Sequence, residues 1–173
     1  MNPVPWRNVK SWKCVGCGMC CRDYHVVLNF NEWATIVRHF GADSTMSSVN
    51  KLLLGKNGDG TCRFLMHDGK TSLCGLQSMK PLACKIWPFK VHDKPKFGRA
   101  NEALYPYRRG SFFIYVDPDC HGLLWGDSTA EFKHQTLPEF IDVALGLQNR
   151  QFHTTSKNRG LTGNQPFRGR TVI

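Results

Sequence analysis

The sequence contains no long apolar run. Its longest apolar stretch, residues 112–116, is far shorter than the roughly 18–20 residues that a membrane-spanning helix needs. The first residues also lack the apolar region and the small-residue cleavage site of a secretory signal. We therefore expect no membrane span and a cytoplasmic location, a compartment in which thiols stay reduced.

The common catalytic and nucleotide-binding motifs are also missing. The chain has no P-loop, no Gly-x-Gly-x-x-Gly and no Gly-x-Ser-x-Gly. Asp23, Glu32 and Asp119 are acid–base candidates, but scattered carboxylates of this kind are usually surface groups. No reaction class follows from the sequence, so whether the protein is an enzyme stays open.

Acidic residues are absent from the last part of the chain. None follows Asp142, whereas the whole chain carries 23 Lys and Arg against 13 Asp and Glu, a net charge of +10. We interpret residues 151–173 as a basic tail that is flexible or ordered by a partner, either a protein or an anionic polymer. Residues 89–110 are a second basic segment, predicted to consist mainly of loops.

Cysteines are the most informative residues that the chain does contain. Four of its eight cysteines lie within eight residues, in the run Cys14-Val-Gly-Cys17-Gly-Met-Cys20-Cys21. In a reducing compartment such a cluster is typical of a metal site, and four thiols in one short loop are poorly placed for disulfides. Glycines at positions 16 and 18 let the loop bend tightly around sulfur.

The spacing leaves two metal chemistries open. Cys14, Cys17 and Cys20 match the first three positions of a bacterial ferredoxin run, but the fourth cysteine with its proline is missing. The two separated Cys-x-x-Cys pairs of a common zinc site are missing as well. Thiolates suit both zinc and iron–sulfur clusters, so the expected cofactor is either zinc or a cluster, the latter of the 4Fe–4S type.

The cysteines and their neighbours resemble a known family. The chain is similar to the YkgJ-like cysteine-cluster family, described as a zinc- or iron-chelating domain with a CxxCxxCC motif. The matching segments, within residues 14–122, are the run from Cys14 to Cys21, Cys62-x-Phe-Leu, Cys74, Lys80-Pro-Leu-Ala-Cys84-Lys-Ile-Trp-Pro88 and Cys120-x-Gly122. One difference is Lys80, where the family commonly has arginine. A related cysteine cluster in flagellin lysine methylases is attributed to an iron–sulfur centre.

The resemblance implies a set of metal ligands. Carried over by position, the candidates are Cys14, Cys17, Cys20, Cys21, Cys62, Cys74, Cys84 and Cys120. A tetrahedral zinc or a four-iron cluster takes four protein ligands, so eight thiols would fill two sites, or one site with thiols to spare. Because Cys20 and Cys21 are neighbours, we expect them to point apart and to serve different metals, or one of them to be structural. Reserve ligands, more often surface residues, are His25, His67 and His121.

The hydrophobic pattern predicts a small α+β domain with short strands, one hairpin and two to four helices. We assign residues 1–13 to an N-terminal arm with Trp6 and Trp12 as buried cover, residues 14–150 to the cysteine-cluster domain and residues 151–173 to the tail. We expect the core to be arranged around the metal, so that chelation would unfold much of the domain.

Individual elements follow from the same pattern. In the first half of the chain we expect a strand at residues 24–30, a helix over 31–40 capped by Asn31, a weaker helix from 44 or 47 to 54, and a hairpin over 62–74 with a turn at Asp68-Gly69. In the second half we expect a helical turn that carries Cys84 between Pro81 and Pro88, and a strand at 111–117. The last expected element is a helix with a capping box at Thr136, whose core stripe includes Leu145.

Two functions are compatible with these observations. The first is a metal-binding protein with an iron–sulfur cluster or zinc that acts in redox chemistry, in sensing or as an accessory to a modifying enzyme. The alternative is a structural zinc module whose basic loop and tail bind nucleic acid or a ribonucleoprotein.

Overall fold

Helices and short strands are mixed in this protein, as the α+β prediction requires. The computed structural model describes residues 2–108, 110–149 and 151–152. Within these residues the helices are α1 (Phe30–Phe40), α2 (Leu82–Ile86), α3 (Ala100–Ala103) and α4 (Leu137–Ala144). The strands are β1 (Val4–Pro5), β2 (Val9–Trp12), β3 (Val27–Leu28), β4 (Thr45–Ser48), β5 (Lys51–Leu54), β6 (Leu65–Asp68), β7 (Thr71–Cys74), β8 (Phe89–His92), β9 (Leu104–Tyr107), β10 (Gly110–Val116) and β11 (Leu123–Trp125).

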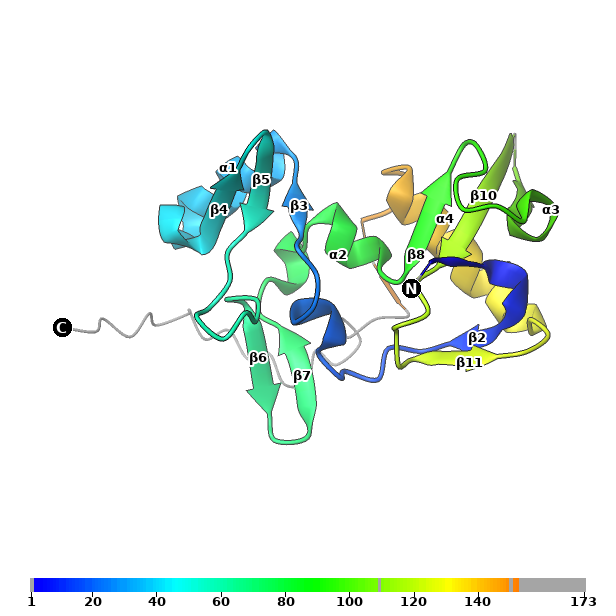
Figure 1. The fold of residues 1–173 in the computed structure, drawn as a ribbon, viewed down its shortest axis with the longest axis horizontal. Helices are drawn as coiled ribbons and strands as arrows, with labels where there is room; N and C mark the ends of the chain where they lie inside the picture. Colours follow the sequence, from blue (N-terminus) through cyan, green and yellow to red (C-terminus); the bar gives the residue numbers. More distant parts are fainter. Residues whose placement is uncertain (1, 109, 150, 153–173) are drawn as a thin grey trace.

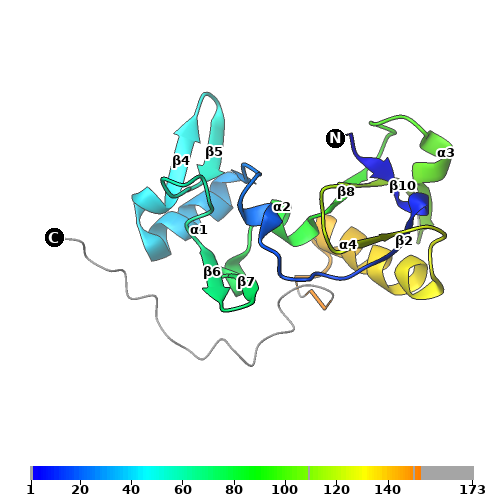
Figure 2. The same ribbon diagram turned by 60° about the horizontal axis from the view of Figure 1, so that its bottom comes forward.

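The elements form two lobes, with α2 between them (Figure 1). The first, here called the α1 lobe, contains α1, the sheet β3-β5-β4 and the hairpin β6-β7. The second, the α4 lobe, contains the sheet β1-β10-β8 with β9 on β10, the pair β2-β11, α3 and α4. Figure 2 shows the same separation from a second direction, again with α2 in the middle.

The α4 lobe has a large aromatic core. Trp12 lies 5.4 Å from Phe89 and 5.1 Å from Phe140 between ring centroids, in edge-to-face contacts that favour aromatic packing. Trp6 and Trp12 are only 4% and 6% exposed, which confirms their predicted burial. The N-terminal segment is joined to this core, because β1 pairs with β10 and β2 pairs with β11.

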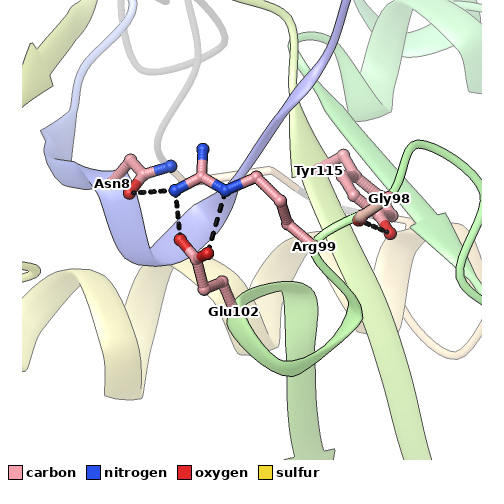
Figure 3. A network of polar contacts seen from close by, with 5 residues as sticks. All are labelled: Asn8, Gly98, Arg99, Glu102 and Tyr115. Carbon is pink, nitrogen blue, oxygen red and sulfur yellow. Dashed lines mark hydrogen bonds and ion pairs between the residues drawn. The ribbon is translucent and has the colours of Figure 1, made fainter.

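A polar network also ties the N-terminal segment to α3 (Figure 3). The Arg99 guanidinium donates to the carboxylate of Glu102, with one bond of 2.9 Å, and contacts the side-chain amide of Asn8. Nearby, the Tyr115 hydroxyl donates to the carbonyl of Gly98 at 2.8 Å. These bonds fix the loop before α3 against β10 and against the short 3-10 turn at Trp6–Asn8.

In the α1 lobe, the predicted helix over 31–40 is present but begins earlier. Its N-cap is Asn29, not Asn31, and Asn29 forms a reciprocal capping box with Glu32 through two bonds of 2.9 Å. Gly41, with φ of 83°, ends the helix. The strand expected at residues 24–30 is shortened to β3 for this reason.

The weak helix predicted up to residue 54 is wrong, because this segment is the hairpin β4-β5. Asn50 adopts a positive φ of 59° in the tight turn between Ser48 and Lys51. β5 then pairs on its other edge with β3. Leu53 and Leu54 are buried by this pairing, so tertiary contacts outweigh the local helical pattern.

Two predictions for the α4 lobe also need correction. Residues 89–110, expected to be loops, contain β8, α3 and β9, because both strands pair with β10 and bury Phe89 and Tyr105. The last helix begins at Ala130 and passes through a π-helical segment, Phe132–Thr136, before α4. Thr136 is therefore a buried helical residue without a capping hydrogen bond, and Leu145 is 47% exposed instead of in the core.

Other expectations have mixed outcomes. The strand at 111–117 is confirmed as β10. No helix in the part of the chain that the structure describes is long and apolar enough to cross a membrane. Residues 153–173 of the predicted tail lie outside the described residues, and the proposed domain boundaries stay predictions.

Candidate metal centre

All eight predicted cysteine ligands line one pocket between the two lobes. The pocket has a volume of about 90 Å³, well above the roughly 10–15 Å³ that one buried water requires. Its walls also include Trp12, Lys80, Trp87 and Gly122. All eight cysteines are free thiols. Donors of one chemical type thus meet here from five separate segments of the chain.

The cysteine loop reaches the pocket by lying closely against β7. Gly16 and Gly18 have φ of 63° and 78°, a region that side chains rarely adopt. A Cβ at Gly16 would be 2.5 Å from the Thr71 methyl, and one at Gly18 would be 2.8 Å from the Ser72 hydroxyl. The backbone N–H of Ser72 donates to the Gly16 carbonyl at 2.7 Å. The two glycines therefore bend the loop, as predicted, and also permit its contact with the hairpin.

The predicted hairpin over 62–74 is present as β6-β7, and it brings Cys62 and Cys74 to the pocket. Leu65 pairs with Cys74, and Cys62 lies just before β6 with its N–H donating to the Cys21 carbonyl at 2.7 Å. The turn is shifted by one residue, because Asp68 pairs with Thr71 and leaves Gly69 and Lys70 as the loop.

Cys84 and Cys120 come from the segment between the lobes and from the α4 lobe. Cys84 lies in α2, which follows Pro81 and ends before Pro88, as predicted. Cys120 lies in the turn after β10, where its Sγ accepts a hydrogen bond from the indole Nε1 of Trp12 at 3.3 Å. Gly122 closes this turn so tightly that a Cβ there would be 2.2 Å from the Lys13 carbonyl oxygen.

Cys20 and Cys21 do not point apart, so this expectation is wrong. Their sulfurs are 4.0 Å from each other. Both lie in the 3-10 turn Met19–Cys21, where successive side chains are rotated by about 120° and not by the 180° of a strand. The two thiols consequently face the same pocket.

The pocket disfavours charged thiols in the absence of a cation. Burial raises the pKa of Cys14, Cys62, Cys74, Cys84 and Cys120. The exception is Cys20, whose pKa falls to about 7 because the Cys21 S–H donates to it, and the same bond raises the pKa of Cys21. A metal cation would supply the charge that lets buried thiols lose their protons.

Two residues with a role at the pocket were missed by sequence reasoning. Lys80 is only 8% exposed, and its positive charge acts to lower the pKa of thiols on both sides of the pocket, among them Cys14 and Cys74. The sequence identified Lys80 only as a difference from the family's arginine. Trp12 was interpreted as cover, whereas it donates to Cys120. For Lys80, the one signal in the sequence was its position between two motif cysteines, Cys74 and Cys84.

The reserve ligands and acid–base candidates lie elsewhere. His25, His67 and His121 are exposed, and within the described residues none of them lines the pocket. Two of the carboxylates have structural partners: Glu32 caps α1, and Asp119 accepts from the Tyr24 hydroxyl at 3.2 Å.

The thiols do not form a finished shell for a single ion. Across residues 2–108, 110–149 and 151–152, no group of three or more His, Cys, Asp or Glu side chains has the arrangement to hold one ion. The donor chemistry fits a soft metal, and loading with one tetrahedral zinc would require the sulfurs to move closer together.

Comparison with known proteins supports metal binding through a family. No curated protein and no solved structure matches the chain. One family model matches residues 13–120, more than half of the 173 residues, and this range contains all eight cysteines. The chain therefore belongs to the CxxCxxCC family, described as a "putative zinc- or iron-chelating domain".

Proposed function

We propose that this protein holds a metal centre in the cysteine pocket. The proposed ligands are the eight thiols of Cys14, Cys17, Cys20, Cys21, Cys62, Cys74, Cys84 and Cys120. The observation that carries the proposal is the meeting of these thiols in one pocket between two lobes. Membership of a zinc- or iron-chelating family supports it independently.

Burial and charge give a physical reason for a cation at this place. Of the eight thiols, only Cys17 is exposed, and burial raises the pKa of most of the others. Lys80 brings one positive charge into the pocket, which falls short of balancing several thiolates. A bound metal would supply the missing positive charge and would join segments from both lobes.

Our preferred metal is iron, in a 4Fe–4S cluster. The spacing of Cys14, Cys17 and Cys20 resembles a ferredoxin run, and Gly16 and Gly18 let the loop backbone approach sulfur. Such a cluster would supply one-electron chemistry, so we place the protein in redox, sensing or accessory roles in the cytoplasm.

The alternative role in nucleic-acid binding gains little from the described residues. Three basic residues of the segment 89–110 form ion pairs within the chain: Lys90 with Asp117, Arg99 with Glu102, and Arg108 with Asp142. These pairs reduce the free positive charge of the segment. We therefore retain the metal-centre proposal as the main one.

Elemental analysis tests the proposal. Full-length protein purified anaerobically should contain stoichiometric iron with acid-labile sulfide and broad visible absorption. Stoichiometric zinc without colour would keep the metal centre and exclude the cluster. A variant with serine at positions 14, 17, 20 and 21 should lose at least half of the metal. Wild-type protein with neither iron nor zinc, purified under reducing conditions, would refute the proposal.

A further inference from the structure

We propose that Tyr24 is a positioning residue that holds the turn carrying Cys120 against the α1 lobe and thereby keeps the thiol pocket closed. The Tyr24 hydroxyl contacts two carboxylates of that turn, those of Asp117 and Asp119, at 3.2 Å each. This contact, here called the Tyr24 clasp, governs access to the thiols. The inference therefore goes beyond the proposal that the pocket holds a metal.

The backbone on both sides of Tyr24 is fixed to the α1 lobe. Before it, the Cys21 carbonyl accepts from the Cys62 N–H at 2.7 Å. After it, the Val26 carbonyl accepts from the Leu54 N–H at 2.9 Å, and β3 then pairs with β5. Tyr24 is therefore held by one lobe from both directions, while its side chain reaches the other lobe.

The two carboxylates are fixed to the α4 lobe. Asp117 directly follows β10, and its N–H donates to the Pro88 carbonyl at 2.9 Å. Its carboxylate pairs with Lys90 of β8 at 3.8 Å and accepts from the Asp119 N–H at 3.3 Å. The side chain of Asp117 is only 8% exposed. The acceptors of the Tyr24 clasp are therefore part of a well-anchored turn.

The Tyr24 clasp lies next to the thiol pocket. Asp119 directly precedes Cys120, which lines the pocket. The ring of Tyr24 lies against that of Trp87, another residue of the pocket wall, with 4.1 Å between the ring centroids. Trp87 follows α2, the helix between the lobes. One side chain thus contacts the α4 lobe and the segment between the lobes, while its backbone belongs to the α1 lobe.

The hydroxyl of Tyr24 favours the closed arrangement for a simple reason. A hydroxyl carries one proton, so Tyr24 is a donor that the two carboxylates share. Asp117 is buried, and a buried acceptor is costly to leave without its donor. Without the hydroxyl, the carboxylates would regain a donor from water only when the lobes separate at this point. Removal of the hydroxyl should therefore make the pocket open more often.

Thiol labelling of the full-length protein, as purified under reducing and anaerobic conditions, tests the Tyr24 clasp. Excess chelator and iodoacetamide are added together, and peptide mapping follows Cys62 and Cys74, two pocket thiols that are distant in sequence from the substituted residues. Tyr24→Phe keeps the ring against Trp87 and removes only the hydroxyl. We expect both thiols to be labelled about tenfold faster than in wild type, because a hydrogen bond to a carboxylate shifts an opening equilibrium by roughly that factor.

Tyr107→Phe is the matched control. The Tyr107 hydroxyl donates to the Asp142 carboxylate at 2.9 Å, and Arg108 pairs with the same carboxylate, as Lys90 does with Asp117. Tyr107 and Asp142 both belong to the α4 lobe, in β9 and α4. The control should lose a similar amount of stability in denaturant without faster labelling. Equal acceleration in both variants, or no acceleration in the clasp variant, would overturn the proposal.

Asp119→Ala tests the same contact from the other lobe. It removes one of the two acceptors, so labelling of Cys62 and Cys74 should accelerate, by a smaller factor than in Tyr24→Phe. The double variant should be labelled no faster than Tyr24→Phe alone, because the two side chains act through one contact. Effects that add in full would overturn the proposal. If Tyr24→Phe does not fold, unchanged labelling in Asp119→Ala overturns it alone.

Metal content, measured before labelling, keeps this proposal separate from the proposed function. Wild-type protein without iron or zinc would refute the metal centre, and the ratio of labelling rates would still test the Tyr24 clasp. Metal-loaded variants with unchanged labelling rates would refute the Tyr24 clasp and leave the metal centre in place.

Discussion

The indole Nε1 of Trp12 donates a hydrogen bond to the Sγ of Cys120 at 3.3 Å, across 108 positions of sequence. A donor of this kind favours the charged form of the thiol, and it acts to lower the pKa of Cys120 against the effect of burial. Groups that hydrogen-bond metal ligands orient them and tune the metal. The N-terminal segment thus contacts one of the proposed metal ligands through a specific polar contact, in addition to covering the core.

Trp12→Phe should weaken the metal centre. Phenylalanine keeps an aromatic ring against Phe89 and Phe140 but cannot donate to Cys120. We expect a loss of about 1–2 kcal/mol in the free energy of unfolding, together with a change in the visible or cobalt-substituted absorption spectrum. Denaturant unfolding and spectroscopy of the loaded protein measure the two effects.

Trp6→Phe is the matched control for this variant. Trp6 is buried in the same core and donates to the Leu104 carbonyl at 3.3 Å, away from the thiols. It should lose similar stability with an unchanged metal spectrum. An identical spectral change in both variants would mean that Trp12 acts only through packing.

Lys80→Met should reduce metal affinity by roughly 10–100-fold. Lys80 lines the pocket and is 8% exposed, and its charge acts to lower the pKa of thiols there, so it favours thiolates. Methionine keeps most of the side-chain volume without the charge. Competition with a chelator of known affinity measures the change. Lys85→Met, which removes the same charge from a residue of α2 outside the pocket lining, should retain wild-type affinity. Equal losses in the two variants would contradict a local role for Lys80.

Gly122→Ala should destabilise the protein by about 3 kcal/mol. The added Cβ would lie 2.2 Å from the Lys13 carbonyl oxygen, so the turn that carries Cys120 would have to move. Gly58→Ala is the control, because nothing lies within 4 Å of a Cβ at that position. The control should change stability by less than about 0.5 kcal/mol. Thermal unfolding measures the stability of the two variants. A Gly122→Ala protein with wild-type stability and full metal content would show that the close approach of Gly122 to Lys13 is dispensable.

His92 should make stability fall at acid pH. Burial, followed by the charges of Lys96 and Lys90, lowers the pKa of His92 below its ordinary value of 6.5. The unfolded chain then binds more protons than the folded one at acid pH, so the stabilising contribution is present above about pH 6.5 and is lost as the pH falls. The free energy of unfolding of His92→Phe minus that of wild type should therefore be larger at pH 5 than at pH 7.5.

His92→Gln is the companion variant for the pH effect. Glutamine also cannot take up a proton, but it packs differently against Phe97 and Tyr115. Its stability difference from wild type should change with pH in the same direction. A pH-independent difference in both variants would show that His92 is not responsible.

Metal removal should loosen the pocket more than the cores. The sequence predicts unfolding of much of the domain, whereas the structure has two apolar cores on either side of the thiols. Hydrogen exchange after chelation should show the largest loss of protection in residues 14–21 and 62–74, and the smallest in β10, whose Ile114 and Val116 are at most 1% exposed. Uniform loss of protection would instead favour a core that depends on metal.

Local signals were enough for several elements and failed for others. The hairpin over 62–74 and the strand at 111–117 were predictable because turn residues and apolar runs are local features. The segment of Leu53 and Leu54 was misassigned because its pairing with β3 is a contact between distant residues. Lys80 was missed because no local pattern indicates that a lysine is buried among thiols.

The sequence by itself determined the chemistry of the site: eight soft donors, two glycines in the loop that carries four of them, and a family resemblance within residues 14–122. Residue type and spacing suffice for that, because thiolates select soft metals in any fold. Only the tertiary structure decided that the thiols meet between two lobes, that Cys20 and Cys21 face the same pocket, and that Trp12 and Lys80 support it. These relationships depend on how two apolar cores pack the chain, which brings together residues that are far apart in sequence.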